Sequence, residues 1–167
     1  MQRGEYHGLD KQHSNYIEAL YLEMFELLFS YARSSLENDS LAEEAVQETF
    51  RIACLKPSEL CASPNPKGWL VNTLKNVVRN IIKQHNAGKL ILATFATEYS
   101  SKQGWSEDQL DLKVVYENIS QLEEFRLLEA TAVEGRSHKE LAQELGISVD
   151  ACKKRIQRAK KVLKKKM

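Results

Sequence analysis

The chain contains little glycine, proline or cysteine: seven, three and three of its 167 residues. Because glycine and proline mark turns, their scarcity and the weak alternation of apolar and polar residues predict a nearly all-helical, all-α fold. Cys54, Cys61 and Cys152 are widely spaced and form no CxxC pair. This argues against a zinc site or a disulfide framework and fits a reducing, cytoplasmic setting. No apolar run reaches 18 residues, so we expect no membrane span, and the first residues lack the apolar core of a secretion signal.

Motifs of catalysis are missing as well. The four histidines, at positions 7, 13, 85 and 138, form neither an HExxH motif nor a triad-like neighbourhood. The sequence has no GxGxxG and no glycine-rich phosphate loop ending in Lys-Ser or Lys-Thr. Without a nucleophile, base or metal cluster, we expect no enzyme, no cofactor and no metal.

Charge is divided unevenly along the chain, although the net charge is only +1. Residues 14–86 hold 7 basic and 9 acidic side chains, whereas residues 117–167 hold 12 and 8. Nine Lys or Arg and no acid fall within residues 153–166. An acidic first part and a basic last part suggest two different partners.

Residues 135–161, GRSHKELAQELGISVDACKKRIQRAKK, predict two short helices joined by a tight turn. Ser137 with Glu140 has capping-box spacing, and Gly146 tolerates the positive φ at which the first helix must end. Ser148 can cap the second helix. The pattern is typical of a helix-turn-helix, although capped helix pairs are also common in all-α proteins that bind no DNA.

The second helix of this pair has two predicted faces. Its apolar residues recur at steps of three or four, which predicts a core of Val149, Cys152, Ile156, Ala159 and Leu163. The outward residues are then Asp150, Lys153, Lys154, Gln157, Arg158 and Lys161. Arg and Lys contact guanine or phosphate and Gln contacts adenine, so this face suits the major groove of DNA. The alternative is that this basic face is simply hydrated and binds no DNA.

Other helices are predicted from apolar periodicity and caps. They cover residues 15–36, 41–55 (capped by Ser40 with Glu43), 66–85, 107–119 (capped by Ser106 with Gln109) and 121–133 (capped by Ser120 with Glu123). The apolar stripe of the first includes Tyr31, residues 1–13 are predicted as a flexible lead-in, and residues 164–167 are predicted to fray. Residues 56–66 are predicted as a loop. We interpret residues 87–106 as a flexible linker between two helical domains, 14–86 and 107–167, although residues 90–95 are apolar enough to pack somewhere.

The helix predicted at 66–85 is divided between an apolar side and a polar side. No acid occurs from position 67 to position 97. The polar side carries only amides and cations, namely Asn72, Lys75, Asn76, Arg79 and Lys83, which suits contacts to phosphates and bases. Trp69 shares the phase of Leu70 and Leu74, so we interpret it as a core aromatic.

Three motifs in this order resemble sigma-70-type RNA polymerase sigma factors. Residues 41–52, LAEEAVQETFRI, and residues 65–82, NPKGWLVNTLKNVVRNII, resemble the second conserved region of that family. Residues 119–164, with EGRSHKELAQELGIS and the basic helix after it, resemble the fourth region. The size and the two-domain layout are similar to the extracytoplasmic-function group. The resemblance implies a region 2 three-helix bundle and a region 4 four-helix domain with a helix-turn-helix.

The resemblance also implies function. Sigma factors bind core RNA polymerase, direct it to promoter DNA and help open the duplex. By position, the resemblance assigns the contacts with the clamp helices of the largest polymerase subunit to Glu44, Gln47 and Glu48. Region 4 is expected to contact the flap of the second-largest subunit. The resemblance assigns contacts with the −10 element to the loop at 56–65 and to Lys75, Asn76, Arg79, Asn80 and Lys83. The −35 element falls to Lys153, Lys154, Gln157 and Arg158. An anti-sigma factor is a plausible further partner.

The chain departs from the family pattern at two positions of the 66–85 helix. Asn72 stands where an Arg is usual, and Asn80 stands where an acid is usual. The preferred −10 sequence therefore does not follow from the resemblance. Two alternatives remain: a helix-turn-helix regulator of the LuxR type that binds DNA without being a polymerase subunit, and a protein-interaction module. The VQETF and GWL helices disfavour the first, and the basic run at 153–166 disfavours the second.

Overall fold

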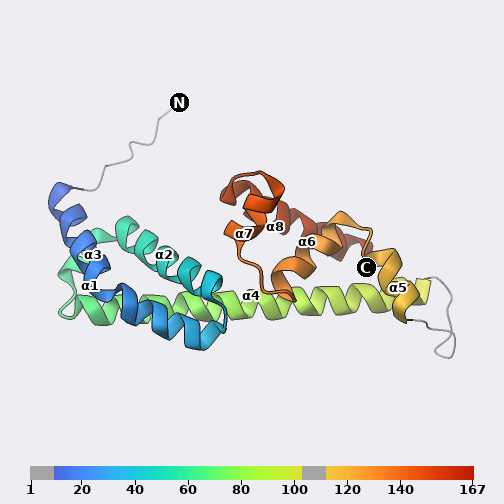
Figure 1. Ribbon diagram of the computed structural model, residues 1–167, viewed down its shortest axis with the longest axis horizontal. Helices are drawn as coiled ribbons and strands as arrows, with labels where there is room; N and C mark the ends of the chain where they lie inside the picture. Colours follow the sequence, from blue (N-terminus) through green and yellow to red (C-terminus); the bar gives the residue numbers. More distant parts are fainter. Residues whose placement is uncertain (1–9, 103–111) are drawn as a thin grey trace. The chain divides into compact units, whose positions relative to one another are not determined.

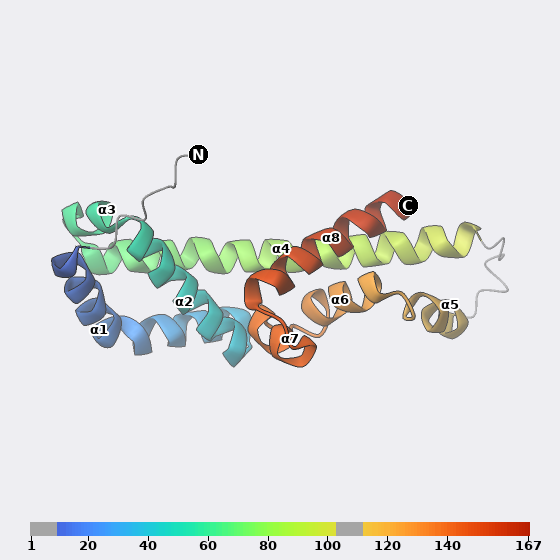
Figure 2. The same cartoon turned by 90° about the horizontal axis from the view of Figure 1, so that it is seen from above.

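The computed structural model describes residues 10–102 and 112–167, with residues 112–115 described by their backbone alone. Every regular element in these ranges is an α-helix, so the predicted all-α class is confirmed (Figures 1 and 2). None of these helices is long and apolar enough to cross a membrane. The helices are α1 (Lys11–Leu36), α2 (Asp39–Leu55), α3 (Pro57–Ala62), α4 (Pro66–Lys102), α5 (Leu112–Ile119), α6 (Glu123–Ala132), α7 (His138–Leu145) and α8 (Val149–Lys166).

The chain divides into two compact units between Asn80 and Ile81, a point that lies within α4. In unit 1, α1 and α2 pack against each other. Helix α1 also contacts the start of α4, where Lys67 forms an ion pair with Glu23 and Lys75 lies over the Tyr31 ring. Leu28, Leu60 and Leu74 are fully buried in its core. Close burial of large aliphatic side chains from each helix is the main force that holds such a small bundle together.

The turn between α1 and α2 differs from the prediction in its capping residue. The cap of α2 is Asn38, whose Oδ1 accepts a hydrogen bond of 2.9 Å from the Leu41 backbone N–H. Ser40, predicted as the cap, lies inside the helix. Sequence spacing could not separate the two because Asn and Ser are equally good caps. The N-terminal end of α1 also differs from the prediction. The helix begins at Lys11, so residues 11–13 of the predicted lead-in are helical. Residues 1–9 lie outside the described part.

The predicted loop at 56–66 contains a short helix, α3, anchored by the fully buried Leu60. Directly after it, Asn65 caps the start of α4 by accepting a 3.0 Å hydrogen bond from the Gly68 backbone N–H. A Cβ at position 68 would lie 2.6 Å from the Asn65 amide nitrogen, so a larger residue there would require the Asn65 side chain to shift. Trp69 is half-buried rather than fully enclosed.

The predicted linker at 87–106 is helical as far as Lys102, the end of α4; its last four residues lie outside the described part. Ile91, Leu92 and Phe95 are buried with Phe125 and Leu128 of α6, so this apolar segment does pack, as its composition suggested. The prediction of a flexible linker was wrong for residues 87–102 because Gly88 looked like a breaker. It is instead a contact point, where an added Cβ would lie 2.7 Å from the Cβ of Ala132.

Two helix starts were predicted in unit 2; one is wrong and the other lies outside the described residues. Helix α6 begins at Glu123 after Leu122, with no side-chain cap, and the Ser120 hydroxyl donates instead to the Glu117 carbonyl at 3.0 Å. The Ser120 cap was therefore wrong. The predicted start of the preceding helix at 106–109 lies outside the described residues, and α5 is described from Leu112.

Candidate nucleic-acid interface

Helices α7 and α8 form the predicted helix-turn-helix, and its caps are confirmed. Ser137 Oγ accepts from the Glu140 backbone N–H at 3.2 Å, while Glu140 Oε2 accepts from the Ser137 N–H at 2.8 Å. Gly146 ends α7 at φ 65°. Ser148 Oγ then accepts from the Ala151 N–H at 3.1 Å and starts α8. These caps satisfy backbone donors at the start of both helices from within the same segment, so its own sequence specifies the turn.

The core beneath this turn holds α8 by one face. Cys152, Ile156 and Ala159 pack against Leu141 of α7 and Leu127 of α6. Leu163, one turn further, joins the separate cluster around Phe95. Four of the five predicted core residues of α8 are buried; Val149 is exposed because it stands at the first helical position, before α7 covers the helix.

The opposite face of α8 is exposed, and it carries the four residues predicted to read the −35 element. Lys153, Lys154, Gln157 and Arg158 are all exposed. None of them makes a hydrogen bond or ion pair with another described residue. At about 100° per residue they form one arc directed away from the buried stripe. Unpaired donors on a solvent-facing helix are available for base edges and phosphates.

Neighbouring cations on α8 are placed differently. Arg155 lies 3.8 Å from the Glu123 carboxylate and so links α8 to α6. Lys160 is half-buried, and this burial, together with repulsion from Lys164, lowers the pKa of its ammonium group. In the turn before α7, Arg136 forms an ion pair with Glu144. These cations hold the domain together or lie at its edge, so only part of the basic run is free for a ligand.

The polar face of α4 is the second basic surface. Asn76, Arg79, Asn80 and Lys83 are exposed, and Lys75 is half-buried. The Arg79 guanidinium donates to Asn76 Oδ1 at 3.3 Å. The four of them that belong to unit 1, from Lys75 to Asn80, lie in one arc of α4, away from Leu74 and Val78 of the core. The unit boundary falls between Asn80 and Ile81, so Lys83 is assigned to unit 2 while the other four belong to unit 1.

The predicted polymerase-binding residues lie together on one side of α2. Gln47 is exposed, and Glu44 and Glu48 are half-buried. The Gln47 amide donates to Glu43 Oε1 at 3.2 Å, and Glu48 accepts two hydrogen bonds of 2.7 Å from Arg51. The steps of three and four place their side chains on adjoining turns. The result is a mainly acidic, partly paired surface.

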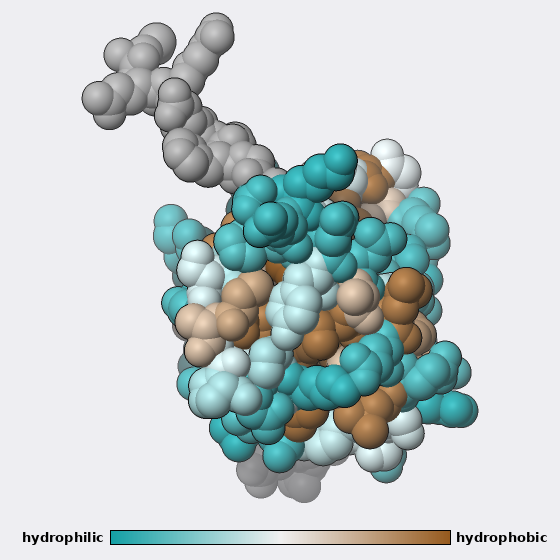
Figure 3. Space-filling model, turned by 90° about the vertical axis from the view of Figure 1, so that its left-hand side faces the viewer, coloured by the Kyte–Doolittle hydropathy of each residue, from teal (hydrophilic) through white to brown (hydrophobic). Residues whose placement is uncertain are grey.

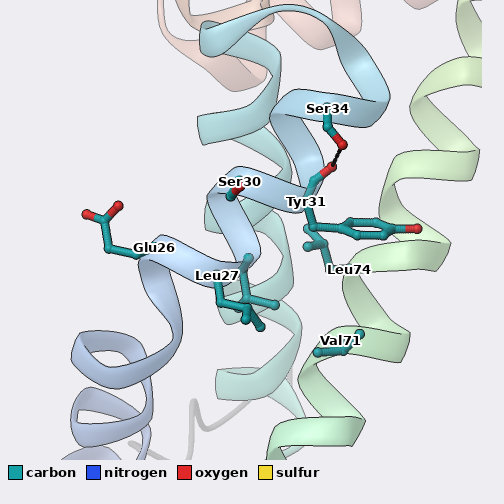
Figure 4. A pocket seen from close by; sticks show the side chains of 8 residues that line it. Glu26, Leu27, Ser30, Tyr31, Ser34, Val71 and Leu74 are labelled. Carbon is teal, nitrogen blue, oxygen red and sulfur yellow. Dashed lines mark hydrogen bonds between the residues drawn. The ribbon is translucent and has the colours of Figure 1, made fainter.

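Sequence reasoning missed one residue beside the α4 face. Tyr31 was predicted on the buried stripe of α1, but its side chain is 39% exposed and points toward α4 (Figure 4). The Nζ of Lys75 lies 6.0 Å from the centroid of the Tyr31 ring. The spacing of Leu27 and Tyr31, one turn apart, could have indicated a second apolar stripe.

Seen from the end of unit 1, hydrophobic areas are bordered by hydrophilic side chains (Figure 3).

Comparison with protein families gives one match. Residues 122–163 match the family described as Sigma-70, region 4, a span that runs from just before α6 to the last turn of α8. The match is confined to these helices of unit 2, and it supports a sigma-factor-like role in DNA binding for this part of the chain. Neither the comparison with curated proteins nor that with solved structures finds a significant match.

Proposed function

We propose that this chain is an RNA polymerase sigma factor of the extracytoplasmic-function type, which acts in the cytoplasm on core polymerase and promoter DNA. The observation that carries the proposal is the coincidence of the region 4 match at 122–163 with an exposed, unpaired basic face on α8. A LuxR-type regulator also needs a helix-turn-helix, but the matched family is that of sigma factors. Initiation by polymerase is therefore the better-supported role.

The −35 element is assigned to α8, which enters the major groove with Lys153, Lys154, Gln157 and Arg158 facing the bases and backbone. A recognition helix in a helix-turn-helix docks in this manner, because its width fits the major groove. The lysines nearer the end of α8 add general attraction to phosphate. The flap of the second-largest polymerase subunit is a further proposed partner of this domain.

The −10 element is assigned to α4, with Lys75, Asn76, Arg79, Asn80 and Lys83 along one arc and the segment at 56–65 beside it. Opening the duplex requires bases to leave the stack, at a cost of a few kcal/mol. A face with amides and cations but no acid stabilises the displaced strand through its phosphates. An anti-sigma factor that binds the chain and restrains it is a further proposed partner.

Polymerase binding is assigned to Glu44, Gln47 and Glu48 on α2. The test is a double variant, Gln47→Ala with Glu48→Lys, in a pull-down of core RNA polymerase by the full chain. The Glu48–Arg51 pair that it breaks joins a half-buried carboxylate to an exposed guanidinium at the surface. Such a pair contributes only about 0–1 kcal/mol, so we expect the fold to be retained. We expect polymerase association at least ten-fold weaker, because a cation replaces an acid in the contact surface.

The matched control is Glu117→Lys, which produces the same change in charge on α5 of unit 2. It is expected to bind polymerase as the unaltered chain does. If the folded double variant binds as tightly as this control, the assigned surface is wrong. If the unaltered chain does not associate with core polymerase at all, the sigma-factor proposal fails.

A further inference from the structure

Residues 88–102, here called the docked segment, form the second half of α4 and are fastened to unit 2 at two places. Three large apolar side chains are buried in one cluster with residues of α5, α6 and α8: Ile91, Leu92 and Phe95. At the end of the helix, the Lys102 ammonium group donates to the Lys166 backbone carbonyl at 2.8 Å. The core of the helix-turn-helix is a separate cluster formed by α6, α7 and α8. Those three helices are therefore held together independently of the docked segment.

The docked segment is a weak helix by its own sequence. The hydroxyl groups of Thr97, Ser100 and Ser101 each donate to the backbone carbonyl four residues earlier, at 3.0, 2.9 and 3.1 Å. Such bonds slightly destabilise a helix, because they compete for its carbonyl acceptors. Gly88 lowers the helix propensity further. The segment is therefore helical mainly because it is packed against unit 2.

Docking keeps one residue assigned to the −10 element close to the reading face of α8. Lys83 lies about 28 Å from Lys102 along α4, and Lys153 lies about 20 Å from Lys166 along α8. The two helices run in the same direction with their C-terminal ends joined by the Lys102–Lys166 hydrogen bond (Figures 1 and 2). All four residues belong to unit 2. Lys83 and Lys153 are therefore separated by only about 20–30 Å.

Promoter elements at −10 and −35 are much farther apart. Their names place them about 25 base pairs from each other, and B-DNA rises about 3.4 Å per base pair, which gives about 85 Å. With the segment docked, Lys83 and Lys153 cannot reach both elements at once. Residues 84–102 extend to about 65 Å when they are not helical, and a domain the size of the rest of unit 2 is about 25 Å across. Release of the docked segment therefore supplies the missing length.

We propose that the docked segment is a releasable latch, which is helical and bound to unit 2 in the free chain and leaves unit 2 when core polymerase and promoter DNA are bound. This inference rests on the proposed function, because it requires both promoter elements to be held by one chain. Core polymerase covers the apolar surface that Phe95 vacates, which offsets the loss of the docked helix. The latch makes simultaneous binding of both elements depend on polymerase.

The test measures the separation of two fluorophores on the full chain by resonance energy transfer. They are coupled to Asn86→Cys and Lys165→Cys, two exposed positions of unit 2, in a chain that also carries Cys54→Ser and Cys61→Ser. Cys152 is fully buried and stays in place. In the free chain the labels should lie within about 40 Å of each other. In a complex with core RNA polymerase and a DNA selected by it from a random library, we expect more than about 60 Å.

Helix propensity at two exposed positions of the docked segment provides an independent test. Thr97→Ala with Ser101→Ala improves the helix without touching the apolar contact, so association with core polymerase should become about five-fold weaker. Thr97→Gly with Ser101→Gly should make it about three-fold tighter, because release then costs less. A purely structural segment would give the opposite order, since the glycine pair destabilises unit 2.

The matched control is Ser34→Ala with Ser35→Ala on α1. Both hydroxyl groups are exposed and donate to the Tyr31 carbonyl, at 3.4 and 3.0 Å. Their removal changes helix propensity in unit 1 alone, so polymerase association should stay as it is in the unaltered chain.

The possible failures are distinguishable. If the labels remain within about 40 Å in a complex that transcribes, the segment is not released, and the inference is overturned while the proposed function stands. If they are already far apart in the free chain, or if the glycine pair weakens polymerase association, the segment is not a latch. If the unaltered chain does not associate with core polymerase at all, the proposed function fails, and the inference fails with it.

Discussion

At the scale of single residues, the basic side chains of α8 differ in their exposure and in their ion-pair partners. Lys153 and Arg158 are exposed and make no hydrogen bond or ion pair with another described residue, whereas Arg155 approaches Glu123 and Lys160 is half-buried. The difference follows from helical phase, because positions near the buried stripe are drawn into the domain. Sequence periodicity had already placed Lys153 and Arg158 on the outward face, and the structure adds the surroundings of Arg155 and Lys160.

A prediction follows for two of these residues. Lys153→Ala and Arg158→Ala are each expected to weaken binding of the holoenzyme to its selected promoter by about 1–3 kcal/mol if the side chain contacts a base edge. The measurement is a binding titration against the promoter and against a copy with an altered −35 element. Arg155→Ala is the matched control on the same helix and should leave discrimination between the two DNAs unchanged. Unaltered binding by both test variants would show that α8 is not the reading helix.

At the scale of elements, α4 carries the most unexpected feature of the fold. It continues past the predicted helix end at residue 85 to Lys102 and supplies Ile91, Leu92 and Phe95 to the core of unit 2. Near its C-terminal end, Lys102 donates to the Lys166 carbonyl at 2.8 Å and so satisfies an acceptor at the end of α8. The second half of α4 is therefore a structural part of the domain that contains the helix-turn-helix.

The close approach of α4 and α6 predicts an inverted effect of alanine at position 88. In a free helix, Gly88→Ala would stabilise by about 0.8–1.0 kcal/mol. Here we expect a net loss, because the added methyl group meets Ala132 at 2.7 Å and overpacking costs about 1–3 kcal/mol. Denaturant unfolding of the full chain measures the difference.

Asn86→Ala, at an exposed position of the same helix, is the control and should stabilise slightly. A second variant, Gly88→Ala with Ala132→Gly, should recover part of the loss by restoring the space. Stabilisation by Gly88→Ala alone would mean that α4 does not pack against α6 in solution.

The elements that sequence predicted well are those whose ends are encoded locally. The Ser137–Glu140 box, Gly146 and Ser148 fix α7 and α8 within a few residues of chain, and all were found as predicted. The second half of α4 was missed because its reason for being helical lies in α6, far away in sequence. Tyr31 was misplaced for the same reason, since its exposure depends on how α4 packs against α1.

At the scale of the whole molecule, the two units carry separate basic surfaces on one chain. Each surface alone is small, and a single recognition helix gives limited affinity for DNA. When both elements are bound by one chain attached to polymerase, the second contact forms at a high effective concentration. If the chain is a sigma factor, as proposed, two units of modest size suffice in this way to specify a promoter.

The most direct measurement of the central claim is run-off transcription by core RNA polymerase on a library of DNA templates, with and without the full chain. The account predicts transcripts that depend on the chain and arise from templates sharing two sequence elements at a constant spacing. The Lys153→Ala and Arg158→Ala variants should reduce these transcripts. A chain that binds DNA by itself yet starts no transcription with core polymerase would contradict the account and indicate a regulator instead.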